Sequence, residues 1–289
     1  MASRFLAASL RKDPEGTVGA TPTLCLVSKW TALSGFANVP IMTTEAAVWP
    51  LGASVFTRLR LGVRALRILQ FEPDHPVQGP LFEWCMDSGS QKTLVKTLQQ
   101  SESGRRILAT RPTLQGGELD LGALQKLPAG TLGHEFFRYF ESNGIAPFLT
   151  TFPIDSDDIY LAKRYRETHD LLHVLTGYPT HMLGEMELQA FVLGNLGLPS
   201  AAMILVFSLG LRLQICGFKQ MGTYFKRLRL AYQRGKASQN LMAVEFEKSW
   251  ERSAREVSNE LIAPAPEVPP MTFGIFQAHK GPAESLVPA

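Results

Sequence analysis

The sequence predicts an all-α protein, built as a single multi-helix domain with an irregular N-terminal arm and a Pro-rich C-terminal tail. Apolar residues recur at helical spacing in segments that end at Pro or Gly, and strand-like alternation is scarce. The 289 residues are 45% hydrophobic and 19% charged, which is a globular composition with ample length for a core. We therefore expect a helical domain over 48–262, a presequence or disordered arm over 1–47, and an irregular tail over 263–289.

Charge and cysteine content exclude several classes of protein. The net charge of +3 is too weak to predict a nucleic-acid partner. Cys25, Cys85 and Cys216 are odd in number and far apart, which favours reduced thiols in a cytosolic or matrix-like compartment. The sequence contains no P-loop, no dinucleotide-binding glycine motif and no G-x-S-x-G elbow, so it indicates no nucleotide, flavin or serine-hydrolase site.

The N-terminal residues MASRFLAASLRK are basic, rich in Ser and free of acids, which is typical of a transit peptide. Asp13 and Glu15 follow directly and interrupt this pattern. No apolar run with a small-residue cleavage site is present, so we do not expect a secretory signal. The sequence leaves open whether 1–47 is cleaved.

The first predicted helix lies within residues 49–70. This stretch has no acidic residue and carries Arg58, Arg60, Arg64 and Arg67 among apolar residues. The pattern fits either an amphipathic helix on a membrane surface or a bundle helix with a solvated arginine edge.

Helical patterns continue after a Pro-rich break at 71–80. Residues 91–108 and 131–144 have apolar residues near helical spacing, and Asn143-Gly144 should end the second of these helices. Both segments belong to the predicted helical domain.

Residues 188–211 contain no charged residue over 24 positions. Asn195, Gly197 and Pro199 divide this stretch, and the uninterrupted part after Pro199 is only about 12 residues, which is short for a membrane span. We expect a core helix that also lines a lipid tunnel or touches the bilayer. Together with 49–70, it predicts peripheral association with a membrane.

A helix with recognisable ends is predicted over 154–179. Asp155 or Ser156 can cap its start, and Gly177 with Pro179 ends it. At roughly 100° per residue, its core-facing residues fall within an arc of roughly 80°, and a polar set falls within roughly 120° on the other side. The core-facing set is Leu161, Tyr165, Thr168, Leu172 and Leu175. The polar set is Lys163, Arg166, His169, Asp170 and His173.

The polar set contains candidate metal ligands. His169 and His173 are spaced i and i+4, so a helix presents both imidazoles to one metal ion. Asp170 can add an oxygen ligand or orient a histidine. Glu185 should lie on the next helix, facing back. Two imidazoles with carboxylate oxygens suit Zn²⁺, with Mn²⁺ or Fe²⁺ as alternatives.

Other interpretations of the same segment stay open. Two histidines four residues apart are often part of a solvated helix face. The motif is not H-E-x-x-H, because Asp follows the first histidine, so a metalloprotease is not expected. His181 and Glu187 are rival ligands; Glu187 should lie about 200° around the helix from the metal if Glu185 faces it. Thr180 is the expected N-cap of the second helix.

The stretch KRYRETHDLLHVLTGYPTHMLGEMELQAF, residues 163–191, resembles the signature of the coenzyme Q biosynthesis protein four family. That signature is H-D-x-x-H followed, after eleven intervening residues, by Glu, in an R-Y-R-E-x-H-D context. His169, Asp170, His173 and Glu185 match all four motif positions. The similarity extends over residues 48–262.

The resemblance implies an all-α protein that works in ubiquinone synthesis in a complex with the other enzymes of the pathway. It implies zinc at the four motif residues, a polyprenyl lipid substrate and a peripheral position on the matrix side of the mitochondrial inner membrane. The bacterial counterpart would lie in the cytoplasm or on the inner membrane face. Self-association is left open.

The family is associated with removal of the C1 carboxylate from a polyprenylated 4-hydroxybenzoate-type precursor, in some accounts coupled to C1 hydroxylation. We therefore expect a metal-dependent carbon–carbon lyase, a carboxy-lyase. The alternative is a non-catalytic, lipid-binding scaffold that organises the other enzymes, as the family has also been described. Arg166 lies on the same arc as the ligands and is a candidate for binding the anionic head group.

Overall fold

The computed structural model describes residues 52–69, 77–114, 119–144 and 155–271. These ranges are mainly helical and contain no β-strand, only an isolated bridge between Thr131 and Ser253, so the all-α prediction is confirmed. The predicted arm 1–47 and the tail beyond Met271 lie outside the described residues.

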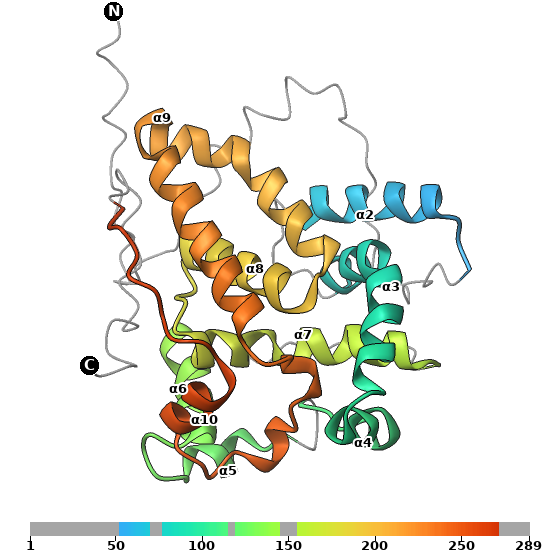
Figure 1. The fold of residues 1–289 in the computed structure, drawn as a ribbon, viewed down its shortest axis with the longest axis vertical. Helices are drawn as coiled ribbons and strands as arrows, with labels where there is room; N and C mark the ends of the chain where they lie inside the picture. The colour runs from blue at the N-terminus through green and yellow to red at the C-terminus, as the bar shows by residue number, and fades with distance from the viewer. Residues whose placement is uncertain (1–51, 70–76, 115–118, 145–154, 272–289) are drawn as a thin grey trace, which may run out of the picture. The chain divides into compact units, whose positions relative to one another are not determined.

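The described helices follow one another along the chain as Figure 1 shows. In order they are α2 (Val55–Leu69), α3 (Gln78–Leu98), α4 (Glu102–Thr110), α5 (Leu121–Gln125), α6 (Leu132–Asn143), α7 (Asp157–Thr176), α8 (Met182–Leu196), α9 (Pro199–Ala237), η3 (Leu241–Ala243), η4 (Phe246–Lys248) and α10 (Ala254–Leu261). None of these helices has the length and apolar content that would be needed to span a membrane.

Helix α7 lies in the core, in contact with α3, α6, α8 and α10. Its apolar residues join the main hydrophobic cluster with aromatic residues of neighbouring helices. Tyr160, Leu161 and Leu172 are fully buried, and Phe136 and Phe191 pack into the same cluster from α6 and α8. The segment that carries the candidate ligands is therefore held by packing on several sides.

Helix α7 begins and ends where the sequence predicts, but the predicted cap at its start does not form. Ser156 occupies the N-cap position with extended backbone and makes no capping hydrogen bond, because its hydroxyl donates to the Asp158 carboxylate instead. It ends at Gly177, whose φ of 73° places it in the left-handed region that glycine adopts at low cost. The Gly177 N–H donates to the carbonyl of His173 at 2.9 Å.

Helices α8 and α9 approach each other closely enough to require glycine. A Cβ at Gly194 would lie 2.1 Å from the carbonyl oxygen of Tyr232, and one at Gly235 would lie 2.0 Å from that of Phe191. Asn195 donates to the carbonyl of Gly235 at 2.9 Å. The uncharged stretch 188–211 is thus divided between two helices, as predicted.

The start of α9 is fixed by a buried carboxylate of α3. Asp87 accepts hydrogen bonds from the Ser200 N–H at 2.7 Å and from the Ser200 hydroxyl at 2.6 Å. These bonds satisfy an N–H group that a helix start would otherwise leave unpaired. Asp87 therefore has a structural partner and does not face the candidate metal site.

Candidate metal centre

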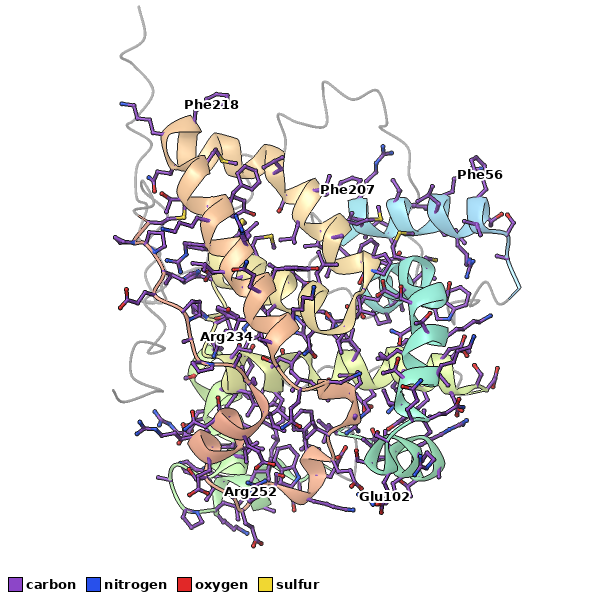
Figure 2. The ribbon with its side chains drawn as sticks, viewed as in Figure 1. Phe56, Glu102, Phe207, Phe218, Arg234 and Arg252 are labelled. Atoms are coloured by element: carbon purple, nitrogen blue, oxygen red, sulfur yellow. The ribbon has the colours of Figure 1, made fainter. Side chains whose placement is uncertain are left out.

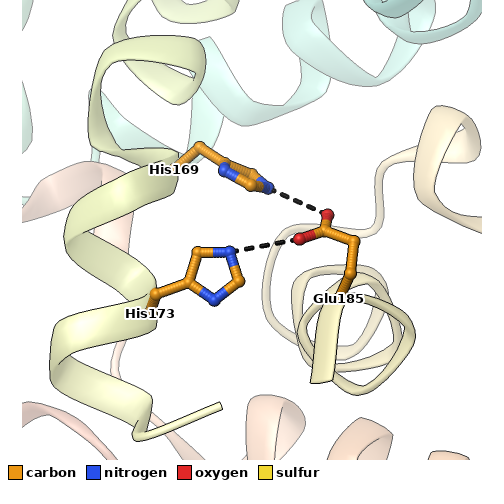
Figure 3. Close-up of side chains that lie close together, drawn as sticks. All are labelled: His169, His173 and Glu185. Carbon is orange, nitrogen blue, oxygen red and sulfur yellow. Dashed lines mark hydrogen bonds and ion pairs between the residues drawn. The ribbon is translucent and has the colours of Figure 1, made fainter. Parts of the chain in front are cut away.

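His169, His173 and Glu185 converge on one point between α7 and α8, as Figure 3 shows. The distance from His169 Nε2 to Glu185 Oε1 is 3.2 Å, and that from His173 Nε2 to Glu185 Oε2 is 3.1 Å. One ligand atom of each residue can be chosen so that all lie within 4.8 Å of one another. The structure therefore brings together three of the four predicted ligands.

The turn between the two helices positions Glu185. His181, not the expected Thr180, precedes α8 as its N-cap, and its Nδ1 accepts a hydrogen bond from the Gly184 N–H at 3.2 Å. The expectation for Thr180 was wrong because its hydroxyl donates instead to Asn143 of α6. The capped first turn places the Glu185 side chain towards α7.

Second partners orient both imidazoles. His173 Nδ1 lies 2.8 Å from the carbonyl oxygen of Tyr178, which can only accept, so Nδ1 carries the proton. His169 Nδ1 lies 3.5 Å from Asp170 Oδ1. In both rings Nε2 is then the nitrogen that points into the site. A ring nitrogen fixed by a carbonyl or a carboxylate behind it is the usual arrangement of metal-binding histidines.

The proton requirements of this cluster test whether it fits a metal ion. Both nitrogens of each ring face oxygen acceptors, whereas a neutral imidazole donates from only one of its nitrogens. Burial opposes the charged form of His169, but the negative charge of Glu185 and hydrogen bonds to Asp170 and Glu185 raise its pKa to about 10. Burial likewise opposes the carboxylate of Glu185, yet the two histidines hold its pKa well below its usual range. Two imidazoles and a carboxylate fit a divalent ion such as Zn²⁺, which would take the place of the shared protons.

Asp170 lies beside the convergent three and not among them. Its Oδ1 faces His169 and accepts a hydrogen bond from the Tyr139 hydroxyl at 3.4 Å. Burial alone would raise the pKa of Asp170, but the hydrogen bond and charge of His169 lower it. The geometry favours orientation of His169 over direct coordination, and ligation by Asp170 stays a prediction.

Arg166 lies on the α3 side of the cluster. Its Nη1 donates to Glu83 Oε1 at 3.3 Å, and its guanidinium would touch a Cβ placed at Gly79, 3.7 Å away. The negative charges of Asp170 and Glu185 also stabilise the positive charge of this guanidinium and help to raise its pKa, although burial opposes the rise. Arg166 is thus a cation within the candidate site, while its binding to substrate stays a prediction.

The polar arc of α7 is not a solvated face. The side chains of His173, His169, Arg166 and Asp170 are 3%, 13%, 20% and 21% exposed. Neighbouring helices cover the arc, so the alternative of an ordinary solvent-facing surface does not hold.

The structure places neither rival ligand with the two histidines. His181 caps α8, and Glu187 is directed to α9, where its Oε1 accepts a hydrogen bond from Arg227 Nε at 2.6 Å. The predicted separation of Glu185 and Glu187 on opposite sides of α8 is therefore observed.

Three further residues around the centre were missed by sequence reasoning. The Tyr139 ring stacks on His173 with centroids 5.7 Å apart, and Gln189 donates to Glu185 Oε1 at 2.9 Å. Glu83 approaches from α3 through Arg166. The i, i+4 spacing from Glu185 could have indicated Gln189, whereas no local pattern indicates Tyr139 or Glu83.

The fold and the site define the protein as an all-α protein with a candidate metal centre of two histidines and a carboxylate between two of its helices. Residues 87–266 match the family described as coenzyme Q (ubiquinone) biosynthesis protein Coq4. The chain belongs to this family, and its role therefore lies in ubiquinone biosynthesis.

Several mitochondrial COQ4 homologues, named as ubiquinone biosynthesis proteins, are similar to this chain. The zebrafish homologue is 31% identical over 239 residues, which cover 80% of this chain and 81% of that protein. The human homologue is 35% identical over 179 residues, covering 61% and 66%. The homologue of Drosophila ananassae is 36% identical over 177 residues, covering 60% and 65%. The last two alignments span slightly less than two thirds of those proteins.

The fold is also similar to a solved structure. A crystal structure of a protein from Nostoc punctiforme, assigned to ubiquinone biosynthesis, superposes with a TM-score of 0.59 at 24% sequence identity. The match covers 71% of this chain and 95% of that one. At this identity the similarity concerns the fold alone.

Proposed function

We propose that the protein is a metal-dependent carboxy-lyase of ubiquinone biosynthesis. Its substrate would be a polyprenylated 4-hydroxybenzoate-type precursor, from which it removes the C1 carboxylate, in an oxidative form together with C1 hydroxylation. The observation that carries this proposal is the convergence of two oriented imidazoles and the Glu185 carboxylate beside the Arg166 cation. Such a site combines a place for a Lewis acid with a charge that attracts an anionic head group.

Each residue has a role in the proposed site. His169, His173 and Glu185 would hold the ion, Zn²⁺ or alternatively Mn²⁺ or Fe²⁺, with Asp170 fixing His169. When bound, the ion would polarise an oxygen of the head group. Arg166 would pair with the carboxylate, and the surrounding burial would strengthen that pairing by excluding water. In the non-oxidative reaction the ring carbon must gain a proton as CO₂ leaves, so a nearby acid contributes.

Release of CO₂ tests the proposal directly. We expect purified, zinc-loaded protein to release CO₂ from a prenylated 4-hydroxybenzoate, and chelation of the metal to abolish this release. The alternative function is a lipid-binding scaffold without catalytic activity. Repeated failure with folded, metal-loaded protein, with and without an added oxidant, would favour the scaffold.

We further propose that the protein acts at the matrix side of the mitochondrial inner membrane, as a peripheral protein in a complex with other enzymes of the pathway. In a bacterium the equivalent place would be the cytoplasmic face of the inner membrane. The similar proteins from zebrafish and human are named as mitochondrial. This location would bring the site to a polyprenyl lipid substrate.

Exposed apolar side chains on two acid-free helices support a membrane-facing surface. Val55 and Phe56 of α2 are 73% and 71% exposed, and Val206 and Phe218 of α9 are 69% and 84% exposed. Phe56, Phe207 and Phe218 lie along the same upper edge of the helices in Figure 2. Helices α2 and α9 contain basic residues but no acidic ones, which suits contact with anionic lipids.

Flotation with vesicles that contain anionic lipids measures this association. We expect the protein to float with the vesicles, and high salt to weaken the binding without abolishing it, because apolar insertion persists when charges are screened. Phe56→Glu combined with Phe218→Glu should release the protein. Arg252→Glu, at the opposite edge in Figure 2, is the control and should float normally. Recovery of the wild-type protein in the soluble fraction with every lipid mixture would contradict the proposal.

A further inference from the structure

Glu83 presents a buried carboxylate oxygen that has no protein partner. Its side chain is 8% exposed, and Oε1 is held by Arg166 at 3.3 Å. Oε2 has no hydrogen-bond partner, although it is completely buried. Buried polar atoms are nearly always hydrogen-bonded, so such an oxygen calls for an explanation.

The position of Glu83 connects this oxygen to the candidate metal centre. Helix α3 packs on α7, and Glu83 reaches the polar arc of α7 through Arg166, which lies three residues before His169. The charge of His169 lowers the pKa of the Glu83 carboxyl, and the charge of Glu185 raises it. On the α8 side, Gln189 Oε1 is also buried without a partner, while its Nε2 is bonded to Glu185. Two acceptors without donors therefore flank the same centre.

The direction of its pKa shift distinguishes Glu83 from Asp170 and Glu185, the two carboxyl groups next to the histidines. Burial raises the pKa of Glu83, although Arg166 and His169 oppose the rise. The pKa of Asp170 is lowered and that of Glu185 lies well below its usual range, chiefly because their histidine partners outweigh burial. Glu83 thus has the highest pKa of these three carboxyl groups, so its ionised form is the strongest hydrogen-bond acceptor among them for a weakly acidic hydroxyl.

We propose that Glu83 is a substrate-binding residue whose Oε2 accepts the hydrogen bond of the phenolic hydroxyl of the head group. This inference rests on the proposed function, because it takes the substrate class from there. A phenol that donates to a carboxylate gains electron density on its oxygen and, through the ring, at the para carbon that bears the leaving carboxylate. The contact breaks no bond and needs no oxidant. It selects substrates that carry a hydroxyl opposite the carboxylate.

A binding cycle with two ligands and two proteins tests this role without requiring turnover. The probes are 4-hydroxy-3-prenylbenzoate and 3-prenylbenzoate, which lacks the hydroxyl, and calorimetry measures their binding to zinc-loaded full-length protein. We expect wild-type protein to prefer the hydroxylated probe by about tenfold or more, because a site built to bond a hydroxyl discriminates against the analogue without it. Glu83→Gln should remove most of this preference while the metal content stays normal.

Asp87→Asn is the matched control. It makes the same carboxylate-to-amide change one turn further along α3, but Asp87 bonds to Ser200 and not to the centre. We expect it to retain the wild-type preference. Should Glu83→Gln fail to fold, Glu83→Asp withdraws the carboxylate by one methylene and should also reduce the preference.

The outcomes separate this inference from the proposed function. Equal affinity of wild-type protein for the two probes would overturn the role of Glu83. Equal losses for both probes in Glu83→Gln would also overturn it and indicate a structural effect. Failure of wild-type protein to bind either probe would overturn it together with the proposed substrate class. Hydroxyl-dependent binding without CO₂ release would support Glu83 and count against the lyase alone.

Discussion

We expect replacement of Glu185 by Gln to weaken metal binding at the proposed site strongly and to leave the helical fold in place. The two carboxylate oxygens of Glu185 face both Nε2 atoms at 3.1 and 3.2 Å, and an amide offers only a neutral oxygen in their place. We expect the metal affinity to fall by at least about 100-fold, more than is typical for loss of an outer partner. His173→Ala should have a similar effect, because either change opens the same site. Elemental analysis beside circular dichroism measures both quantities.

Glu187→Gln provides the control for this prediction. Glu187 is only two residues further along α8, but its carboxylate pairs with Arg227 of α9. Its replacement should leave the metal content unchanged. Normal metal content in Glu185→Gln, with loss instead in Glu187→Gln or on replacement of His181, would show that the ligand is wrongly assigned.

The same site predicts the pH dependence of metal binding. In the metal-free protein the pKa of His169 is raised to about 10, with Glu185 as the main cause that opposes burial, so the ring carries its extra proton at neutral pH. A metal ion must displace that proton, and its apparent affinity should rise with pH by about tenfold per unit for each proton released. Affinity should therefore fall as the pH is lowered. A pH-independent affinity would contradict ligation by His169.

Features set by local sequence could be predicted. The end of α7 follows from Gly177, and the i, i+4 pair of histidines follows from helical geometry alone. Glu185 could be placed because only a short turn separates its helix from α7. These inferences need no knowledge of how distant helices pack.

The rest of the site depends on packing between distant segments. Glu83 and Tyr139 come from α3 and α6, and nothing near them in the sequence marks them as neighbours of His169 or His173. The burial of the polar arc has the same origin, because α3, α6 and α8 cover it only in the folded protein. Arg164 shows the effect most clearly, since it lies in a charged run that looks solvent-facing and is nevertheless fully buried.

Arg164 joins α7 to the loop after α4 and to the segment that contains η3 and η4, and its loss should strongly destabilise the fold. Its guanidinium donates to Glu247 Oε1 at 2.7 Å and to the carbonyl oxygens of Val244 and Pro112 at 2.7 and 3.3 Å. Arg164→Met removes the charge and all of these donors while keeping much of the apolar stem. Because the carboxylate and the carbonyls would then lack partners, we expect a loss of about 3–5 kcal/mol in the free energy of unfolding.

Denaturation in guanidinium chloride measures this loss, and a double variant shows its cause. In Arg164→Met/Glu247→Leu no charge is left unpaired, so stability should partly recover, since a buried ion pair can often be replaced by apolar residues at little cost. Glu260→Gln is the control, because the pair of Glu260 with Arg252 is 51% and 45% exposed, and exposed pairs contribute little. A loss below about 1 kcal/mol in Arg164→Met, within the range of an ordinary surface change, would mean that the buried pair does not hold these segments together.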